Sequence, residues 1–202
     1  MSSRADNTKQ KLYDAAVAVL GEKGFTGTSV DEIVERAGVA KGTVYYHFAG
    51  KAELVEALIE DRMRPLADAF RQAADDNSGN PSAALAAIIR AELLFFSDDT
   101  SFSKLLLTEM WREDRVWRST LLMLRDEMFA VIERVIVQGI ESGAFRGGID
   151  PAFGASALFG MTATTALDWL AFRPETPLEA VAAQINAIVA ASTRPDAVDT
   201  KQ

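Results

Sequence analysis

The stretch GFTGTSVDEIVERAGVAKGTVYYHFAGKAELV, residues 24–55, decides the fold that we predict for this chain of 202 residues. Ser29 precedes Glu32 by three residues, which is the spacing of a capping box, and Gly38 follows the apolar pattern as a stop signal. A second short segment, VAKGTVYYHF (39–48), comes after a turn of about three residues. Two short helices joined by a glycine-containing turn are typical of a helix-turn-helix.

The segment 39–48 is rich in β-branched and aromatic side chains, which by themselves favour a strand. Wound as a helix, it places Val44 and Phe48 on one side as apolar anchors. The remaining surface carries a glycine, hydroxyls, flat rings and cations, namely Lys41, Gly42, Thr43, Tyr45, Tyr46 and His47. Such a helix fits the major groove of DNA, where side chains read base edges and hydroxyls and cations hold phosphates.

The charge distribution bears on a nucleic-acid partner. A net charge of −8 argues at first against DNA, because phosphate binding is mainly electrostatic. Residues 1–50 are nevertheless neutral, with six basic and six acidic side chains, so the acidic surplus lies downstream. A neutral module on an acidic body can still bind DNA if its cations face one way.

Several function classes find no support in the sequence. There is no cysteine, and a single histidine cannot complete a zinc site. We find no nucleophile elbow and no phosphate loop, so we expect no enzyme activity, no metal and no cofactor. No apolar run reaches the roughly 18 residues of a membrane span, and the first residues lack a signal peptide. We therefore expect a cytoplasmic protein.

Apolar periodicity and stop signals predict an all-α protein of about nine helices. Beyond the helix-turn-helix, the expected helices begin at residue 51 and cover about 82–97, 101–111, 113–142, 151–172 and 177–192. Pro65 lies inside the helix that starts at Lys51, where it removes a backbone hydrogen bond and is expected to cause a kink. The last ten residues are expected to be a disordered tail.

Residues 24–55 resemble the tetracycline-repressor (TetR) family of bacterial transcription regulators. The shared pattern is Gly-aromatic, Thr-Ser/Thr-Val, Ile, Ala-Gly-Val, Gly, Tyr-x-His-Phe and Lys. The resemblance implies an all-α homodimer that binds a palindromic operator and is released by a small molecule. It implies a helix-turn-helix DNA-binding domain over residues 1–50 and a helical-bundle domain for ligand binding and dimerisation over 51–202.

The resemblance also implies roles for individual residues. Base edges would be read by Lys41, Gly42, Thr43 and Tyr46. Phosphates would be contacted by Thr28, Ser29, Tyr45, His47 and Lys51. Each of these side chains could instead serve packing alone or simply face solvent. Ala40 stands where the family often has serine, which predicts a weaker cap for the recognition helix.

The downstream part is dense in Met and aromatic residues, which predicts an apolar effector cavity, although ordinary core packing explains most of them. The candidate lining residues are Met63, Phe70, Phe95, Glu109, Met110, Trp111, Met128, Phe129, Met161, Asp168 and Trp169. A buried carboxylate needs a partner, so Glu109 or Asp168 could bind a cationic or hydroxylated effector. Either could instead face solvent or pair with an arginine such as Arg112, and a long acyl effector is equally compatible.

The last two predicted helices suggest a dimer interface. Small side chains at helical spacing, Gly154, Ala157, Gly160 and Thr164, would let two helices approach closely. The final helix adds an apolar face through Val181, Ile185, Ile188 and Val189. Two helices from each of two subunits would make a four-helix interface, whereas the alternative is packing within one chain.

These observations favour a ligand-responsive, dimeric repressor with DNA and a small-molecule effector as partners. A lipid carrier or a carboxylate-based enzyme on a helical bundle is the alternative of a different class. A transcriptional activator would share the same DNA motif.

Overall fold

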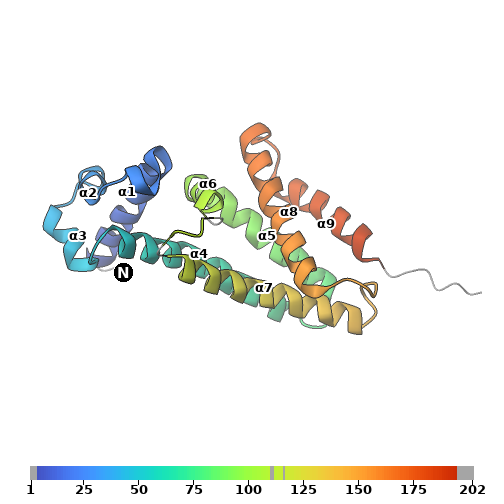
Figure 1. The fold of residues 1–202 in the computed structure, drawn as a ribbon. Helices are drawn as coiled ribbons and strands as arrows, with labels where there is room; N and C mark the ends of the chain where they lie inside the picture. Colours follow the sequence, from blue (N-terminus) through green and yellow to red (C-terminus); the bar gives the residue numbers. More distant parts are fainter. Residues whose placement is uncertain (1–3, 110–111, 116, 195–202) are drawn as a thin grey trace, which may run out of the picture. The chain divides into compact units, whose positions relative to one another are not determined.

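The computed structural model describes residues 4–109, 112–115 and 117–194, and within these ranges all regular secondary structure is α-helical (Figure 1). Nine helices are present in the described part, which confirms the predicted all-α fold. The chain packs as two compact units. Unit 1 holds the residues up to Arg64 together with Asp99–Leu124, and unit 2 holds Pro65–Asp98 together with the residues from Arg125 onward.

Unit 1 contains the helix-turn-helix. Its elements are α1 (Arg4–Gly27), α2 (Val30–Ala37), α3 (Lys41–His47), the first half of α4 (Lys51–Asp76), α6 (Thr100–Glu109) and the start of α7 (Arg118–Glu141). Helix α1 packs against both α2 and α6. The apolar side chains of these helices, among them Leu12, Ile33, Val44, Leu54 and Phe102, form a shared core with almost no exposed surface.

Unit 2 contains the second half of α4, α5 (Pro81–Asp98), most of α7, α8 (Pro151–Phe172) and α9 (Leu178–Thr193). Helix α5 packs against α8 and α9. One face of α5 is buried along its whole length and carries Leu85, Ile88, Ile89, Leu93 and Phe96. The same buried face carries one acidic residue, Glu92.

The caps of the short helices follow the sequence. Ser29 caps α2 and forms a complete capping box with Glu32, as the spacing predicts. Gly38 ends α2 in the left-handed conformation, at φ 64°, which favours glycine. Ala40 precedes α3 without a side-chain hydrogen bond, so the weak cap predicted from its substitution for serine is confirmed.

The start of α7 differs from the sequence-based expectation, and α1 and α4 each continue past a residue that commonly disrupts helices. Helix α1 continues to Gly27 after a kink at Gly24, which has a φ of 68°. Helix α7 begins at Arg118 rather than near residue 113, because part of the connection from α6 forms a turn. Helix α4 is helical on both sides of Pro65, and the two units part at this residue.

Candidate DNA-binding and effector sites

Helix α3 presents the most exposed aromatic surface of unit 1. Val44 and Phe48 are buried and anchor the helix, whereas Tyr46 is 84% exposed and Tyr45 is 53% exposed. Tyr46 packs edge-on against the His47 ring at a centroid distance of 5.1 Å. The helix thus shows outward the surface that the sequence predicts, including exposed Lys41 and Gly42 and half-buried Thr43 and His47.

Lys41 is already paired with a neighbour in α2. Its ammonium donates to the Asp31 carboxylate at 2.7 Å, and both side chains are largely exposed. The bond to Asp31 raises the pKa of Lys41, so the side chain stays charged at neutral pH. A DNA phosphate or base would therefore have to compete with Asp31 for this cation.

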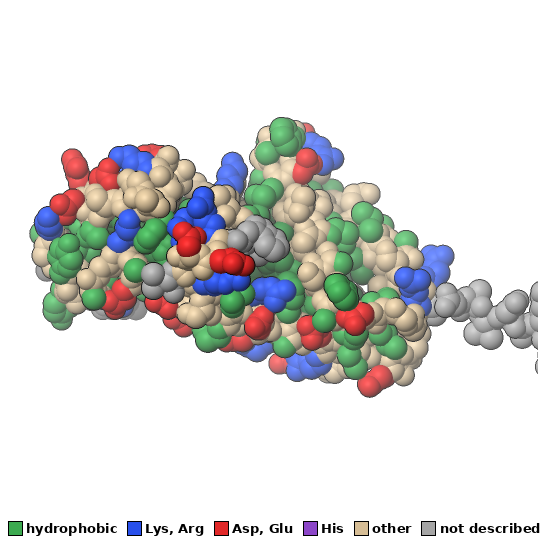
Figure 2. Space-filling model, in the orientation of Figure 1, with side chains coloured by type: hydrophobic (Ala, Val, Ile, Leu, Met, Phe, Trp, Pro, Cys, Tyr) green, Lys and Arg blue, Asp and Glu red, His purple; other side chains and the backbone are tan. Residues whose placement is uncertain are grey.

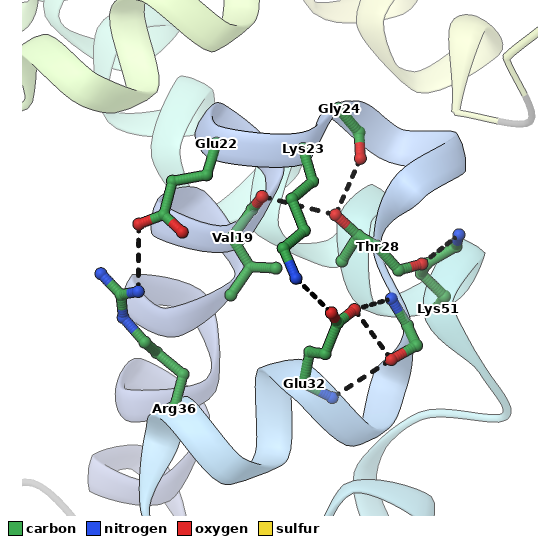
Figure 3. A network of polar contacts seen from close by, with 9 residues as sticks. Val19, Glu22, Lys23, Gly24, Thr28, Glu32, Arg36 and Lys51 are labelled. Atoms are coloured by element: carbon green, nitrogen blue, oxygen red, sulfur yellow. Dashed lines mark hydrogen bonds and ion pairs between the residues drawn. The ribbon is translucent and has the colours of Figure 1, made fainter.

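A polar network fixes the orientation of α2 against α1 (Figure 3). Glu32 accepts from the Ser29 N–H at 2.8 Å and pairs with Lys23 of α1. Hydrogen bonds from Lys23 and Ser29 lower the pKa of Glu32 to about 2. Further along the two helices, Arg36 donates to Glu22 at 3.0 Å. The Ser29 hydroxyl also donates to Glu32, at 2.9 Å, and is therefore engaged within the helix-turn-helix.

Two predicted phosphate contacts also point into this module. The Thr28 hydroxyl is buried and donates to the Gly24 carbonyl at 2.7 Å. The Lys51 ammonium donates to the carbonyls of Phe25 and Thr28 at 2.7 and 2.6 Å, and it lies 4.1 Å from the centre of the Phe25 ring. Both side chains brace the corner between α1 and α2, and a role for either in phosphate binding stays a prediction.

The surface charges are mixed rather than separated. Figure 2 shows acidic and basic side chains interspersed over the drawn face. In the helix-turn-helix region the cations Lys23, Arg36 and Lys41 each pair with a carboxylate. The electrostatic attraction of this module for DNA is therefore weak until the ion pairs open.

The predicted effector residues are not gathered in one place. Met63 is buried in unit 1, whereas Phe70, Met128, Phe129 and Trp169 are buried in unit 2. Phe95 and Met161 of unit 2 are half-buried. Met110 and Trp111 lie outside the described residues. Their neighbours explain most of the buried rings as core: Phe129 packs against Phe159 at 5.5 Å, and the Trp169 indole donates to the Thr176 carbonyl at 2.9 Å.

Both candidate carboxylates have arginine partners. Glu109 is buried and accepts from Arg115 at 2.5 Å, and the Arg115 side chain is itself buried. Arg112 is more distant from Glu109, at 3.7 Å. Asp168 is half-exposed and pairs with Arg173. These arrangements correspond to the arginine-paired alternative, and a ligand contact at either residue stays a prediction.

Several hollows are found in the described residues, among them one in unit 1 and one in unit 2 with mainly apolar linings. The hollow in unit 1 has a volume of about 20 Å³, room for one water molecule, and is enclosed by α1, α4, α6 and the start of α7. Phe25, Glu109 and Trp117 line it, and the buried Trp117 N–H has no acceptor among the described residues. The hollow in unit 2 is a groove of about 270 Å³ between α8 and α9, floored by Leu85 and Ile136.

Glu92 of α5 is the buried acidic residue that the sequence reasoning missed. Its side chain has no exposed surface, and neither carboxylate oxygen has a hydrogen-bond donor among the described residues. Burial raises its pKa well above the ordinary value for glutamate. The signal was available, because Glu92 lies in the apolar run IIRAELLFF just as Glu109 lies in LLLTEMW.

The small residues of α8 form an exposed stripe. Ala157, Gly160 and Thr164 are exposed, and Gly154 is half-buried. In α9, Val181 and Ile185 are buried within the chain, Ile188 is exposed and Val189 is half-buried. Phe153 adds a 79% exposed ring at the start of α8. Part of the predicted interface is therefore unpartnered apolar surface, and part is core of unit 2.

Two negative findings hold for the described residues. No group of histidine, cysteine and acidic side chains there has the makings of a metal site. None of the helices in this part of the chain is both long and apolar enough to cross a bilayer.

An exposed recognition helix, held by a capped second helix, defines a helix-turn-helix DNA-binding protein. The chain matches "Bacterial regulatory proteins, tetR family" over residues 12–58 and "Tetracyclin repressor-like, C-terminal domain" over residues 78–192. The chain belongs to the TetR family, and it is a DNA-binding transcriptional regulator rather than an enzyme.

Individual relatives share the fold over nearly the whole chain. The fatty acid metabolism regulator protein of Bacillus subtilis (strain 168) is 22% identical over 160 residues, covering 79% of this chain and 82% of that protein. The structure of FadR from Bacillus subtilis in complex with stearoyl-CoA superposes with a TM-score of 0.77 at 20% identity, covering 92% and 99% of the two chains. The ketosteroid transcriptional regulator KstR2 of Mycobacterium tuberculosis gives a TM-score of 0.77 at 25% identity, covering 96% of each chain.

Proposed function

We propose that this regulator is a homodimeric repressor that binds a palindromic operator through α3 and releases it when a small, mainly apolar effector binds. The observation that carries the proposal is the exposed face of α3, where Tyr46 stands 84% exposed on a helix anchored by buried Val44. A large ring held in solvent has no role in the core, whereas it can contact bases in the major groove.

The first test measures the binding of DNA from the region upstream of the chain's own gene by fluorescence anisotropy. We expect Tyr46→Ala and Lys41→Ala each to weaken binding by about 1–3 kcal/mol with unchanged folding. Arg90→Ala is the matched control, because Arg90 also forms an exposed ion pair, with Glu179 at 2.8 Å, but lies in unit 2. Wild-type affinity in both α3 variants would refute this recognition surface.

Salt dependence tests whether the regulator holds this DNA through its phosphates. Binding through phosphates weakens steeply as salt rises, because counterions are released from the DNA. The upstream DNA should therefore bind at low salt with a steep slope. An absence of binding at low salt would show that this DNA does not contain the operator, and transcription assays with and without effector would separate a repressor from an activator.

The exposed stripe of α8 supports the homodimer. A Cβ added at Gly160 would meet no atom within 4 Å, so a large side chain there fits the single chain. We expect Gly160→Arg to yield monomers in sedimentation velocity, because an arginine would intrude between two closely packed α8 helices. Gly21→Arg in α1 is the control, since Gly21 has the same free space in unit 1. A Gly160→Arg dimer of wild-type stability would exclude this interface.

The nature of the effector draws support from two relatives. One relative was solved with stearoyl-CoA, and another is named as a ketosteroid regulator; both names point to molecules with large apolar parts. We infer that an effector bound in the regulatory part changes the direction of α4 at Pro65. Coupling of this kind requires different effector affinities for two conformations. If Pro65→Ala leaves both operator affinity and effector-driven release unchanged, the proline has no role in coupling effector binding to operator release.

A further inference from the structure

Glu92 is the least satisfied polar side chain in the described part of unit 2. It has no exposed surface, and both of its carboxyl oxygens lack a donor among the described residues. Buried polar groups in native proteins are nearly always hydrogen-bonded, and the rare exceptions call for an explanation. The neighbouring buried residues of the same helix, such as Ile88, Ile89 and Phe96, offer only hydrocarbon.

An unpaired buried carboxyl lowers stability. A buried acceptor without a partner destabilises a protein by about 1–3 kcal/mol, and an apolar residue of similar size at such a place is often neutral or stabilising. Glutamate therefore does not contribute to the core packing of α5 in the way that its leucine and isoleucine neighbours do. A carboxyl kept at this position is available to a group that comes from outside the chain.

The chemistry of the missing partner follows from the surroundings. A carboxyl oxygen accepts a hydrogen bond from an N–H or O–H group, and a cation also restores its charged form. The buried helix face around the Glu92 carboxyl is apolar, so the rest of the ligand that binds it must be apolar as well. We propose that Glu92 is the polar anchor of the effector, which is an apolar molecule carrying a hydrogen-bond donor such as an ammonium or hydroxyl group.

This inference rests on the proposed function, since it names the chemical class of the effector. Glu92 lines none of the five hollows found in the described residues, so the donor reaches it only when α5 separates from side chains packed around it. Binding should therefore appear as altered hydrogen–deuterium exchange in α5. Arginine-paired Glu109 and Asp168 do not offer free acceptors of this kind.

The test uses three probes with the same ten-carbon chain: decylamine, 1-decanol and decyl methyl ether, the last of which has no donor. Their dissociation constants are measured by calorimetry with the full chain and no DNA. We expect the amine or the alcohol to bind wild type roughly 10- to 100-fold more tightly than the ether. Equal binding of all three, or binding of none, overturns the anchor.

Variants of the anchor sharpen the result. Glu92→Leu should remove the preference over the ether, whereas Glu92→Gln should keep 1-decanol binding and lose decylamine binding. Glu141→Gln is the control, an exposed glutamate at the end of α7 in the same unit, and it should leave probe affinity unchanged. Retained preference for the donor-bearing probes in Glu92→Leu would refute the proposal.

The melting temperature gives an independent readout without any probe. If the carboxyl has no partner in the protein, Glu92→Leu should melt above wild type; a lower melting temperature would show that Glu92 serves packing or an internal bond, and would overturn the proposal. Failure here is distinguishable from failure of the proposed function. Loss of operator recognition would leave the probe results intact, whereas a failed anchor would leave operator binding intact.

Discussion

Glu109 in α6 and Glu92 in α5 are both buried glutamates within apolar helices, yet their surroundings differ. Glu109 accepts a hydrogen bond from Arg115 at 2.5 Å, whereas Glu92 has no donor among the described residues. The first carboxylate helps to tie the α6–α7 connection to the rest of unit 1. The second has no structural task that its contacts reveal. The comparison shows that the burial of an acidic side chain says little about its role until its hydrogen-bond partner is known.

The largest effect is expected from the ionisation of Glu92, because its burial is complete. Burial raises its folded-state pKa, so the folded protein keeps a proton that the unfolded chain loses above a pH of about 4.3. Stability from this residue is therefore present at low pH and is lost as the pH rises toward the folded-state pKa.

Urea denaturation between pH 5 and 8 measures this dependence. We expect the free energy of unfolding of wild type to fall with pH relative to that of Glu92→Gln, which cannot ionise. Glu141→Gln is the control, because Glu141 is exposed at the end of α7 in the same unit. Parallel curves for wild type and Glu92→Gln would show that the carboxyl is solvated or paired.

The second-largest effect is expected when Arg115, the hydrogen-bond partner of Glu109, is removed. Arg115→Ala leaves a buried carboxylate without its main donor and should lower the free energy of unfolding by about 1–3 kcal/mol. Arg112→Ala acts on the same carboxylate, but Arg112 is exposed and 3.7 Å away, so a much smaller loss is expected. Equal losses in chemical denaturation would contradict the assignment of Arg115 as the main partner.

The smallest effects are expected at the helix caps. Here too a capped helix, α2, can be compared with an uncapped one, α3. Ser29→Ala breaks the capping box of α2 and should cost about 0.5–2 kcal/mol of stability. Ala40→Ser supplies the missing cap of α3 and should raise stability by up to about 1 kcal/mol. An unchanged melting temperature in Ala40→Ser would show that the first turn of α3 needs no cap.

The sequence predicted the fold well where local signals and packing agree. The capping box at Ser29, the stop at Gly38 and the missing cap at Ala40 are short-range features, and the structure has all three. The start of α7 was predicted too early, because residues 112–115 form a turn in which Arg115 pairs with Glu109. The spacing of apolar residues does not reveal an ion pair between two side chains.

The candidate sites were less accessible to sequence reasoning. The outward face of α3 follows from two anchor positions on one helix, so Tyr45 and Tyr46 could be placed. Which carboxylate lacks a partner depends on side-chain packing, which periodicity does not reveal. The expectation that a buried carboxylate needs a partner was sound, but it was applied to Glu109 and Asp168. These two residues pair with Arg115 and Arg173. Glu92 has no hydrogen-bond donor among the described residues.

The position of Lys51 has a practical consequence for exchanging DNA-binding modules between family members. A chimera joined at residue 50 would take the lysine of α4 from one parent and the carbonyls of Phe25 and Thr28 from the other. A junction at Arg64–Pro65 would take the Lys51 hydrogen bonds from a single parent. It would also keep the buried first half of α4 together with the helix-turn-helix. Grafts cut there should inherit their operator preference, and they keep the stability of the donor module only if Asp99–Leu124, which packs in the same unit, comes from the same parent.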